Sequence, residues 1–334
     1  MASVSSLGEL DLIARLKRRV GPAPAWLPVG IGDDAAVIEP PRGGLDVITT
    51  DCLIEDVHFR RAWTAARAIG HKAVAVNVSD LAAMGASPRA VFLSLALPPD
   101  LAVADFDGLI DGVVSAAGAH GAVLAGGNLA RSPGPLMVDV TAVGACARRR
   151  VLIRGGGRPG DALYVTGAVG AAAAGLAMLS AGVDRDALDA AARACIERYE
   201  QPVPRARCGR IVAASRAASA CIDLSDGLAE GARQMADASG TGVRLIAAAV
   251  PVHEGARAWA ELRAIDPIRL ALEGGEDYEL LFAVPPRRRR AFAGALRRCP
   301  DLTVTYVGDL TRETGAALDR GGTTEPLPAG FRHF

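Results

Sequence analysis

Ala220-Cys221-Ile222-Asp223-Leu224-Ser225-Asp226-Gly227 joins a short apolar run to a cluster of acidic and hydroxyl side chains. The apolar run predicts a buried strand over 220–224, and the pattern after it predicts a helix over 227–239. Carboxylates beside small or hydroxyl-bearing neighbours bind hard cations through oxygen. A strand that ends in such a cluster indicates an α/β fold with a cation site at Asp223, Ser225 and Asp226. Ser225 equally suits a cap of the following helix, whose dipole Asp226 would favour.

Five other segments place acidic or amide residues beside glycines or hydroxyls, and most fall where a strand or a buried helix is expected to end. These segments are Gly30-Ile31-Gly32-Asp33-Asp34, Thr49-Thr50-Asp51, Ser79-Asp80, Gly126-Gly127-Asn128 and Gly274-Gly275-Glu276-Asp277. In proteins, Mg²⁺ usually accompanies phosphate groups. So many segments in one chain predict an enzyme that handles a polyphosphate through several metal ions.

Three of these segments have both a structural and a functional interpretation. Asn77 and Asp80 fall on the apolar stripe of a helix expected over 65–84, where a charge is costly unless it is paired or metal-bound. Asp80 is therefore a metal ligand, a helix cap or half of a buried salt bridge. Thr49-Thr50-Asp51 ends a strand expected over 45–50, and open α/β sheets bind ligands at such ends. For Asp33, which follows glycine, a simple turn is the alternative.

Strands that end in acidic loops occur in both halves of the chain, which indicates two related α/β modules. The stretch 148–161 is rich in Arg, Gly and Pro and is the expected boundary. We therefore expect one domain over 1–148 and a second over 149–334. A length of 334 residues is comfortable for two domains.

Composition excludes several classes of protein. Half of the residues are hydrophobic and the formal net charge is zero, which argues against a nucleic-acid or membrane-surface partner. No apolar run approaches the roughly 20 residues that span a bilayer. The six cysteines are far apart and form no Cys-x-x-Cys pair, so we expect reduced thiols in a cytoplasmic protein. The sequence also has no Walker A motif and no protein-kinase signature.

In this order and at these intervals, the motifs resemble the thiamine-monophosphate kinase family over nearly the whole chain. The most specific agreement lies in 30–36, in Thr49-Thr50-Asp51 with His58-Phe59, and in 75–86, 222–228 and 274–280. The superfamily includes aminoimidazole ribonucleotide synthetase and selenophosphate synthetase. The resemblance implies a two-domain α/β fold of the α+β type. In it the N-terminal domain binds ATP and Mg²⁺ and pairs across a homodimer, and the C-terminal domain completes the nucleotide and substrate site.

The same resemblance implies a reaction, which is the ATP-dependent, in-line phosphorylation of thiamine monophosphate to thiamine diphosphate with several Mg²⁺ ions. The implied metal ligands are Asp33, Thr49, Thr50, Asp51, Asp80, Asn128, Asp223 and Asp226, among which the five aspartates Asp33, Asp51, Asp80, Asp223 and Asp226 are the implied catalytic residues. The implied nucleotide contacts are Gly127, Asn128, Arg154 and Ser225, and the implied contacts to thiamine monophosphate are His58 and Glu276. Because a phosphate oxygen is already anionic at neutral pH, the aspartates are assigned to metal binding and not to proton transfer.

Three positions depart from the family pattern. Asn128 stands where aspartate is frequent, which keeps an oxygen ligand but loses its charge. His120 lies near the position of a tyrosine in some members, and Pro328 replaces an aromatic residue that covers the thiamine, with Phe331 close by.

Two other functions stay open. One is another ATP-dependent activity of the superfamily, similar to selenophosphate or aminoimidazole ribonucleotide synthetase. Selenophosphate synthetases carry a reactive Cys or selenocysteine with a lysine in an N-terminal glycine-rich loop, whereas 22–32 contains neither Cys nor Lys. Cys52 stands beside Asp51, but the segment 55–59 that follows fits the thiamine-monophosphate kinase family better. The other is a non-catalytic nucleotide or metal sensor. Release of ADP that depends on thiamine monophosphate distinguishes these functions.

Overall fold

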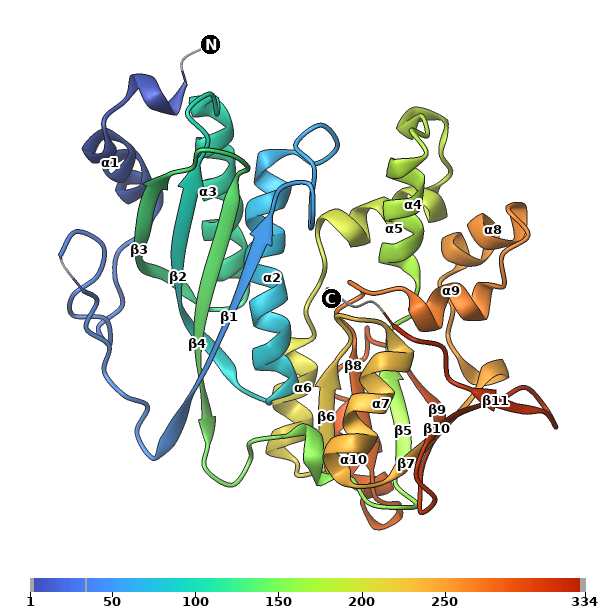
Figure 1. Ribbon diagram of the computed structural model, residues 1–334. Helices are drawn as coiled ribbons and strands as arrows, with labels where there is room; N and C mark the ends of the chain where they lie inside the picture. The colour runs from blue at the N-terminus through green and yellow to red at the C-terminus, as the bar shows by residue number, and fades with distance from the viewer. Residues whose placement is uncertain (1–2, 34, 331–334) are drawn as a thin grey trace. The chain divides into compact units, whose positions relative to one another are not determined.

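The computed structural model describes residues 3–33 and 35–330, so that Asp34 and Phe331 lie outside the described residues. The chain forms two compact units, one made of Met1–Leu81 and Ala86–Arg148 and the other of Ala82–Gly85 and Arg149–Phe334. Both units combine helices with a sheet that contains parallel and antiparallel pairs (Figure 1). The predicted α/β fold of the α+β type is thereby confirmed. In the described ranges, no helix has the length and apolar character that a bilayer crossing requires.

The described part of the first unit contains a four-stranded sheet in the order β1-β4-β2-β3, whose β2 and β3 run parallel. Its strands are β1 (Gly44–Ile54), β2 (Ser87–Leu97), β3 (Val123–Arg131) and β4 (Met137–Ala147). Its helices are η1 (Val4–Ser6), α1 (Glu9–Arg19), α2 (Ala66–Ala83, whose last two residues belong to the second unit) and α3 (Val103–Ala119). Helices α2 and α3 lie on one face of this sheet (Figure 1).

Helices α2 and α3 approach each other closely through glycines. A Cβ atom on Gly70 of α2 would lie 2.0 Å from the carbonyl oxygen of Leu109, and one on Gly112 of α3 would lie 2.0 Å from that of Arg67. The crossing therefore admits no side chain at either glycine. Helix α2 is buried so completely that Asn77 is 0% exposed, as its place on the apolar stripe predicted.

Two of the acidic segments lie inside strands, so the expected strand ends were wrong. Strand β1 continues to Ile54, which puts Thr49-Thr50-Asp51 in its interior, and β3 runs through Gly126-Gly127-Asn128. Glycine and aspartate have low strand propensity, but pairing with neighbouring strands overrides it. A Cβ atom on Gly127 would lie 1.9 Å from the carbonyl oxygen of Leu93, so this pairing requires glycine.

The described part of the second unit contains a seven-stranded sheet in the order β11-β10-β7-β9-β5-β8-β6. Its strands are β5 (Ala162–Thr166), β6 (Ala220–Asp223), β7 (Gly242–Ile246), β8 (Leu280–Val284), β9 (Val304–Thr311), β10 (Ala316–Asp319) and β11 (Thr324–Pro326). Its α-helices are α4 (Ala171–Ser180), α5 (Ala190–Glu200), α6 (Ala206–Ala214), α7 (Leu228–Ser239), α8 (Glu254–Leu262), α9 (Pro267–Glu273) and α10 (Arg289–Leu296). Short 3-10 turns are η2 (Arg154–Gly156), η3 (Arg185–Ala187), η4 (Ala247–Ala249) and η5 (Pro286–Arg288).

Strands β6 and β8 are buried along their whole length and run antiparallel, with Asp223 opposite Leu280. The carboxyl end of β6 therefore meets the amino end of β8. The sequence segments 223–226 and 274–277, which are about fifty residues apart in the chain, are brought together at this edge.

Two buried carboxylates fix the chain just before β8. Glu279 is 0% exposed and receives hydrogen bonds from the guanidinium of Arg205 and from Thr166 Oγ1, the latter at 2.6 Å. Asp277 accepts hydrogen bonds from the backbone N–H groups of Gly170 and Ala172, at 2.6 and 3.1 Å, where α4 begins. A carboxylate at a helix N-terminus satisfies donors that the helix itself leaves unpaired.

Burial raises the pKa of the Asp277 carboxyl to about 7, although the hydrogen bonds from the two backbone N–H groups lower it. The folded chain then holds this proton at pH values where the unfolded chain has lost it. The contribution of Asp277 to the free energy of unfolding should therefore decrease as the pH rises from about 4 to about 7.

We expect the free energy of unfolding of the wild type to fall, relative to that of the Asp277→Asn variant, as the pH rises through this window. Urea denaturation of both proteins at several pH values measures it, since groups common to the two cancel. A difference that stays constant with pH would contradict the raised pKa.

Candidate functional site

Two loops of the second unit are joined by backbone hydrogen bonds. The N–H of Glu276 donates to the carbonyl of Ser225 at 2.7 Å, and the N–H of Tyr278 donates to the carbonyl of Leu224 at 3.0 Å. A Cβ atom on Gly275 would lie 2.4 Å from the Ser225 carbonyl oxygen, so glycine is needed for this contact. The structure thus brings together Ser225, expected at the nucleotide, and Glu276, expected at the substrate.

The backbone at Glu276 is held in a conformation that side chains rarely adopt. Glu276 has a φ of 66° and Tyr278 a φ of 50°, both in the left-handed region. Such residues persist where the surroundings determine them, and here the buried carboxylates of Asp277 and Glu279 are anchored on either side of Tyr278. The half-buried Glu276 side chain therefore starts from a fixed backbone position.

The acidic cluster after β6 lies beside the start of α7. Asp223 is buried at the end of the strand, whereas Ser225 and Asp226 are half-buried. Gly227, which carries no side chain, is the N-cap residue of α7. The alternative that Ser225 caps the helix is therefore wrong.

Arg154 lies in the turn η2, next to α7. Its Nη1 donates to Gln234 Oε1 at 3.1 Å, and its backbone carbonyl accepts from Ser239 Oγ at 3.2 Å. The arginine is exposed and fixed against the helix that begins after Asp226. Its contact with a nucleotide stays a prediction.

In the first unit, the structure brings Thr49 of β1 to Asp80 of α2. Thr49 Oγ1 donates to Asp80 Oδ2 at 2.5 Å, and Asp80 is half-buried at the helix surface. Because side chains alternate along a strand, Asp51 lies on the same face of β1 as Thr49. A hydroxyl and two carboxylates thus share the side of the sheet that faces α2.

The other sites predicted in this unit lie elsewhere. Thr50 faces the opposite side of β1, where Thr141 Oγ1 donates to its hydroxyl at 3.1 Å. Asn128 of β3 is exposed and pairs with Ser94 of β2, in the row that continues to Asp139 of β4. This row of paired residues puts Asn128 on the same face of the sheet as Thr50. Asp33 is exposed in the loop that precedes β1.

His58 sits in a turn that follows β1, and its ring orientation is fixed. The N–H of Ile54 donates to His58 Nδ1 at 3.1 Å, so the neutral ring carries its proton on Nε2. Lys72 of α2 is 1% exposed and donates to the carbonyl of His58 at 3.2 Å. The turn that carries His58 is therefore fixed by bonds from both β1 and α2.

The sequence reasoning missed a role for both lysines of the chain. Lys72 supports the His58 turn, and Lys17 of α1 lies against Gly32, where a Cβ atom would be 2.1 Å from its Nζ. The signal was the scarcity of lysine itself, since Lys17 and Lys72 are the only two in 334 residues. Each lies beside a segment expected to bind phosphate or metal.

The oxygen donors fit Mg²⁺ by their chemistry. Thr49 and Asp80 place a hydroxyl and a carboxylate 2.5 Å apart, with Asp51 on the same face, and such hard oxygen ligands are the kind that Mg²⁺ takes. Within the described residues, however, no group of three or more His, Cys, Asp or Glu side chains is close enough to hold a metal ion. The eight predicted metal ligands therefore stay predictions.

Cys52 is poorly suited to act as a nucleophile. Burial raises the pKa of its thiol, and the charges of Asp139 and Asp51 raise it further. Since the thiolate is the reactive form, the neutral thiol disfavours the alternative that depends on a reactive cysteine.

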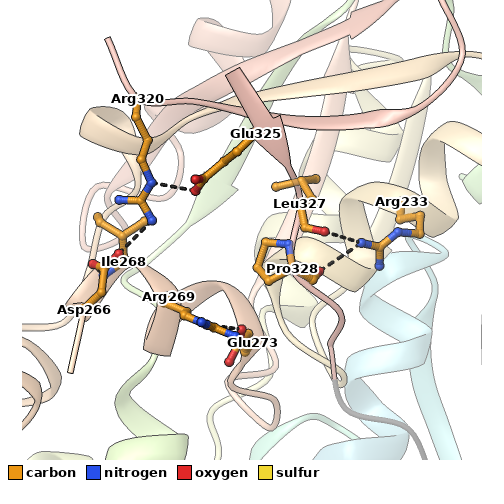
Figure 2. A network of polar contacts seen from close by, with 9 residues as sticks. All are labelled: Arg233, Asp266, Ile268, Arg269, Glu273, Arg320, Glu325, Leu327 and Pro328. Atoms are coloured by element: carbon orange, nitrogen blue, oxygen red, sulfur yellow. Dashed lines mark hydrogen bonds and ion pairs between the residues drawn. The ribbon is translucent and has the colours of Figure 1, made fainter. Parts of the chain in front are cut away.

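The described end of the chain lies against α7. Arg233 Nη2 donates to the carbonyls of Leu327 and Pro328, at 3.1 and 2.9 Å (Figure 2). A Cβ atom on Gly330 would lie 2.5 Å from the carbonyl oxygen of Asp226, so this glycine touches the acidic cluster directly. The segment 327–330 is thus held beside the residues expected to bind metal.

We expect Arg233→Met to release this segment, because two backbone carbonyls lose a charged donor. The cost should be about 1–3 kcal/mol in the free energy of unfolding, with faster hydrogen exchange in the peptide 324–330. Urea denaturation and exchange mass spectrometry measure these effects.

Arg269→Met is the matched control, because Arg269 pairs with Glu273 on the surface of α9 in the same region (Figure 2). This exposed pair should contribute less than about 0.5 kcal/mol. Equal effects of the two substitutions would contradict the role given to Arg233.

The chain was compared with known proteins. Residues 32–146 match the AIR synthase related protein, N-terminal domain, and residues 158–320 match the corresponding C-terminal domain. The thiamine-monophosphate kinase of Escherichia coli (strain K12) is 37% identical over 333 residues, which cover 98% of each chain.

Solved structures agree with this result. The thiamine-monophosphate kinase from Stenotrophomonas maltophilia K279a has a TM-score of 0.83 and 33% identity, covering 95% of this chain and 98% of that one. AaThiL complexed with AMPPCP and TMP has a TM-score of 0.77 and 31% identity, covering 100% and 99%. At this identity over the full length, the chain belongs to the thiamine-monophosphate kinase family of AIR synthase related proteins.

Proposed function

We propose that this protein transfers the γ-phosphoryl group of ATP to thiamine monophosphate and so forms thiamine diphosphate and ADP. The observation that carries the proposal is the hydrogen bond of 2.7 Å between the N–H of Glu276 and the carbonyl of Ser225. It places a residue assigned to the acceptor substrate directly beside one assigned to the nucleotide. Membership of the thiamine-monophosphate kinase family supports the choice of substrates.

In this reaction a phosphate oxygen of thiamine monophosphate attacks the γ-phosphorus of ATP, and ADP leaves in line. The attacking oxygen is already anionic at neutral pH, so no side chain has to remove a proton. His58 donates its Nε2–H to the acceptor phosphate and orients it. Glu276 presents a carboxylate that suits the cationic thiazolium ring.

Two anionic substrates repel each other, and metal ions bound by the acidic clusters would reduce this repulsion. We assign Mg²⁺ binding in the first unit to Asp33, Thr49, Thr50, Asp51, Asp80 and Asn128, and in the second unit to Asp223 and Asp226. Mg²⁺ held by these residues would supply positive charge that offsets the phosphate charge. Gly127, Asn128, Arg154 and Ser225 contact the nucleotide. Because Asn128 is neutral, its position should hold a metal ion less tightly than an aspartate would.

We also propose that the protein is a cytoplasmic homodimer. ATP is its co-substrate, and none of the six cysteines forms a disulfide, as a reducing compartment would keep them. The face of the first unit's sheet that carries Thr50 exposes 66% of Ile48. An exposed apolar side chain at this position suits a contact with a second copy.

The proposed reaction predicts thiamine diphosphate from ATP, Mg²⁺ and thiamine monophosphate, and none when EDTA replaces the metal. Asp51→Asn should lower turnover at least about 100-fold, because a metal ligand loses its charge. Product formation and circular dichroism are measured together, so that a loss of activity is not mistaken for unfolding.

Asp46→Asn is the control for that variant. Asp46 lies on the same strand but faces Arg89 at 3.6 Å, and its loss should leave turnover within about twofold. Free thiamine lacks the phosphate nucleophile and should give no product. Full activity of Asp51→Asn, or efficient phosphorylation of free thiamine, would overturn the proposed roles.

The homodimer is tested by Ile48→Glu, which should produce a monomer, because burying a charge in an apolar contact is costly. Light scattering after size-exclusion chromatography measures the mass. Val203→Glu, at an exposed apolar position of the second unit, should leave the dimer intact. A monomeric wild type would contradict the proposal.

A further inference from the structure

The second unit contains a cavity of about 550 Å³ whose lining is dominated by arginine. We call it the arginine pocket and define it by six side chains, Arg149, Arg150, Arg158, Arg216, Arg287 and Arg288. They come from the stretch before β5, from the residues that follow α6 and from the turn η5. Segments far apart in the sequence thus place six arginines around one space.

The charges in this pocket are not balanced by the protein. Among the described residues that line it, Asp161 is the one acid, and its carboxylate is already engaged by Ser219 Oγ at 2.5 Å and the N–H of Arg158 at 3.1 Å. Within residues 3–33 and 35–330, none of the six guanidinium groups forms an ion pair, and Arg288 alone among them donates a side-chain hydrogen bond, to the carbonyl of Ala218 at 3.0 Å.

Other arginines of the same unit form ion pairs with acidic side chains. Arg185 pairs with Glu200, Arg205 with Glu279, and Arg320 with both Asp266 and Glu325. Acidic partners are therefore available in this unit, yet none is placed in the pocket lining beyond Asp161. Unpaired like charges repel each other, and a concave site lined by one sign of charge concentrates ligands of the opposite sign.

The pocket is separate from the site of the proposed reaction. It contacts Ala218 and Ser219 before β6 and Pro285 after β8, whereas Asp223 and Glu276 lie at the other ends of these two strands. The four residues of β6 span about 10 Å or more. A ligand of the arginine pocket therefore does not need to occupy the acidic cluster.

The lining also limits the kind of ligand. Guanidinium forks match phosphate oxygens in geometry, and several of them suit more than one phosphate. None of the described lining residues is aromatic, so the lining offers no aromatic ring on which a nucleobase could stack. The volume is that of a small-molecule site. We propose that the arginine pocket binds the diphosphate or triphosphate group of a small metabolite.

Isothermal titration calorimetry with inorganic pyrophosphate tests this proposal. EDTA is present throughout, so that the acidic clusters have no metal with which to hold phosphate. The wild type should bind, and Arg149→Gln/Arg287→Gln should weaken the affinity at least about tenfold, because two charge-assisted contacts are lost. Arg158→Gln/Arg216→Gln removes the same charge from two other sides of the pocket and should act likewise.

Arg148→Gln/Arg290→Gln is the matched control, because both arginines are exposed, lie one and three residues from Arg149 and Arg287, and do not line the pocket. It loses the same net charge and should change the affinity less than about twofold. Equal weakening in the control, or no binding by the wild type at physiological ionic strength, would overturn the proposal. So would equal affinity for inorganic phosphate, or tighter binding of an RNA oligonucleotide that the pocket variants abolish.

Two further titrations identify which metabolite supplies the phosphate group. ADP and thiamine diphosphate are titrated in the same way, and tighter binding of either one supports the proposal and names the class of metabolite. The proposed kinase reaction is assayed separately on the pocket variants. Because the pocket lies away from the acidic cluster, its failure to bind pyrophosphate and a failure of the kinase reaction are distinct results.

Discussion

The short stretch Asp277–Glu279 carries the constraint on which the second unit's site depends. Glu279 is fully buried between Arg205 and Thr166, and Asp277 accepts a backbone hydrogen bond at the N-terminus of α4. Breaking one partner of a buried ion pair leaves an uncompensated charge, which is strongly destabilising. The anchored carboxylates hold Tyr278 in a left-handed conformation and, through it, fix the backbone bond between Glu276 and Ser225.

In the first unit, polar groups lie on both faces of a sheet that helices α2 and α3 cover on one face. Alternation along β1 sends Thr49 and Asp51 toward α2 and Thr50 away from it. Thr49 is then satisfied by Asp80, and Thr50 by Thr141. The same strand thereby serves two surfaces. We assign metal binding to Thr49 and Asp51 on one side and to Thr50 on the other, where Ile48 is also assigned to association with a second copy.

Strands β6 and β8 give the second unit two functional ends. Acidic side chains follow β6 at one end, where the reaction is assigned, and arginines surround the other, where Ser219 and Pro285 lie. Short antiparallel strands keep the two ends at a fixed separation. Opposite charges at opposite ends of the same pair also avoid mutual neutralisation, which would weaken the attraction of each end for its own ligand.

The sequence by itself determined the class of fold and predicted the residues of the candidate site, because both rest on local patterns. Apolar periodicity gave the helix α2 and the burial of Asn77, and the order of the acidic motifs gave the family. It misplaced the ends of β1 and β3, since strand pairing overrides the low propensity of glycine and aspartate. It also left open whether Ser225 caps α7 and where Lys72 points.

Only the tertiary structure decided which of these residues meet. The bonds between Thr49 and Asp80, and between Glu276 and Ser225, join segments that no local pattern connects. The arginine pocket likewise exists only because three distant segments converge. Local sequence fixes propensity and the direction of a side chain within its element, whereas long-range contacts depend on how whole elements pack, and that is settled by the burial of the entire core.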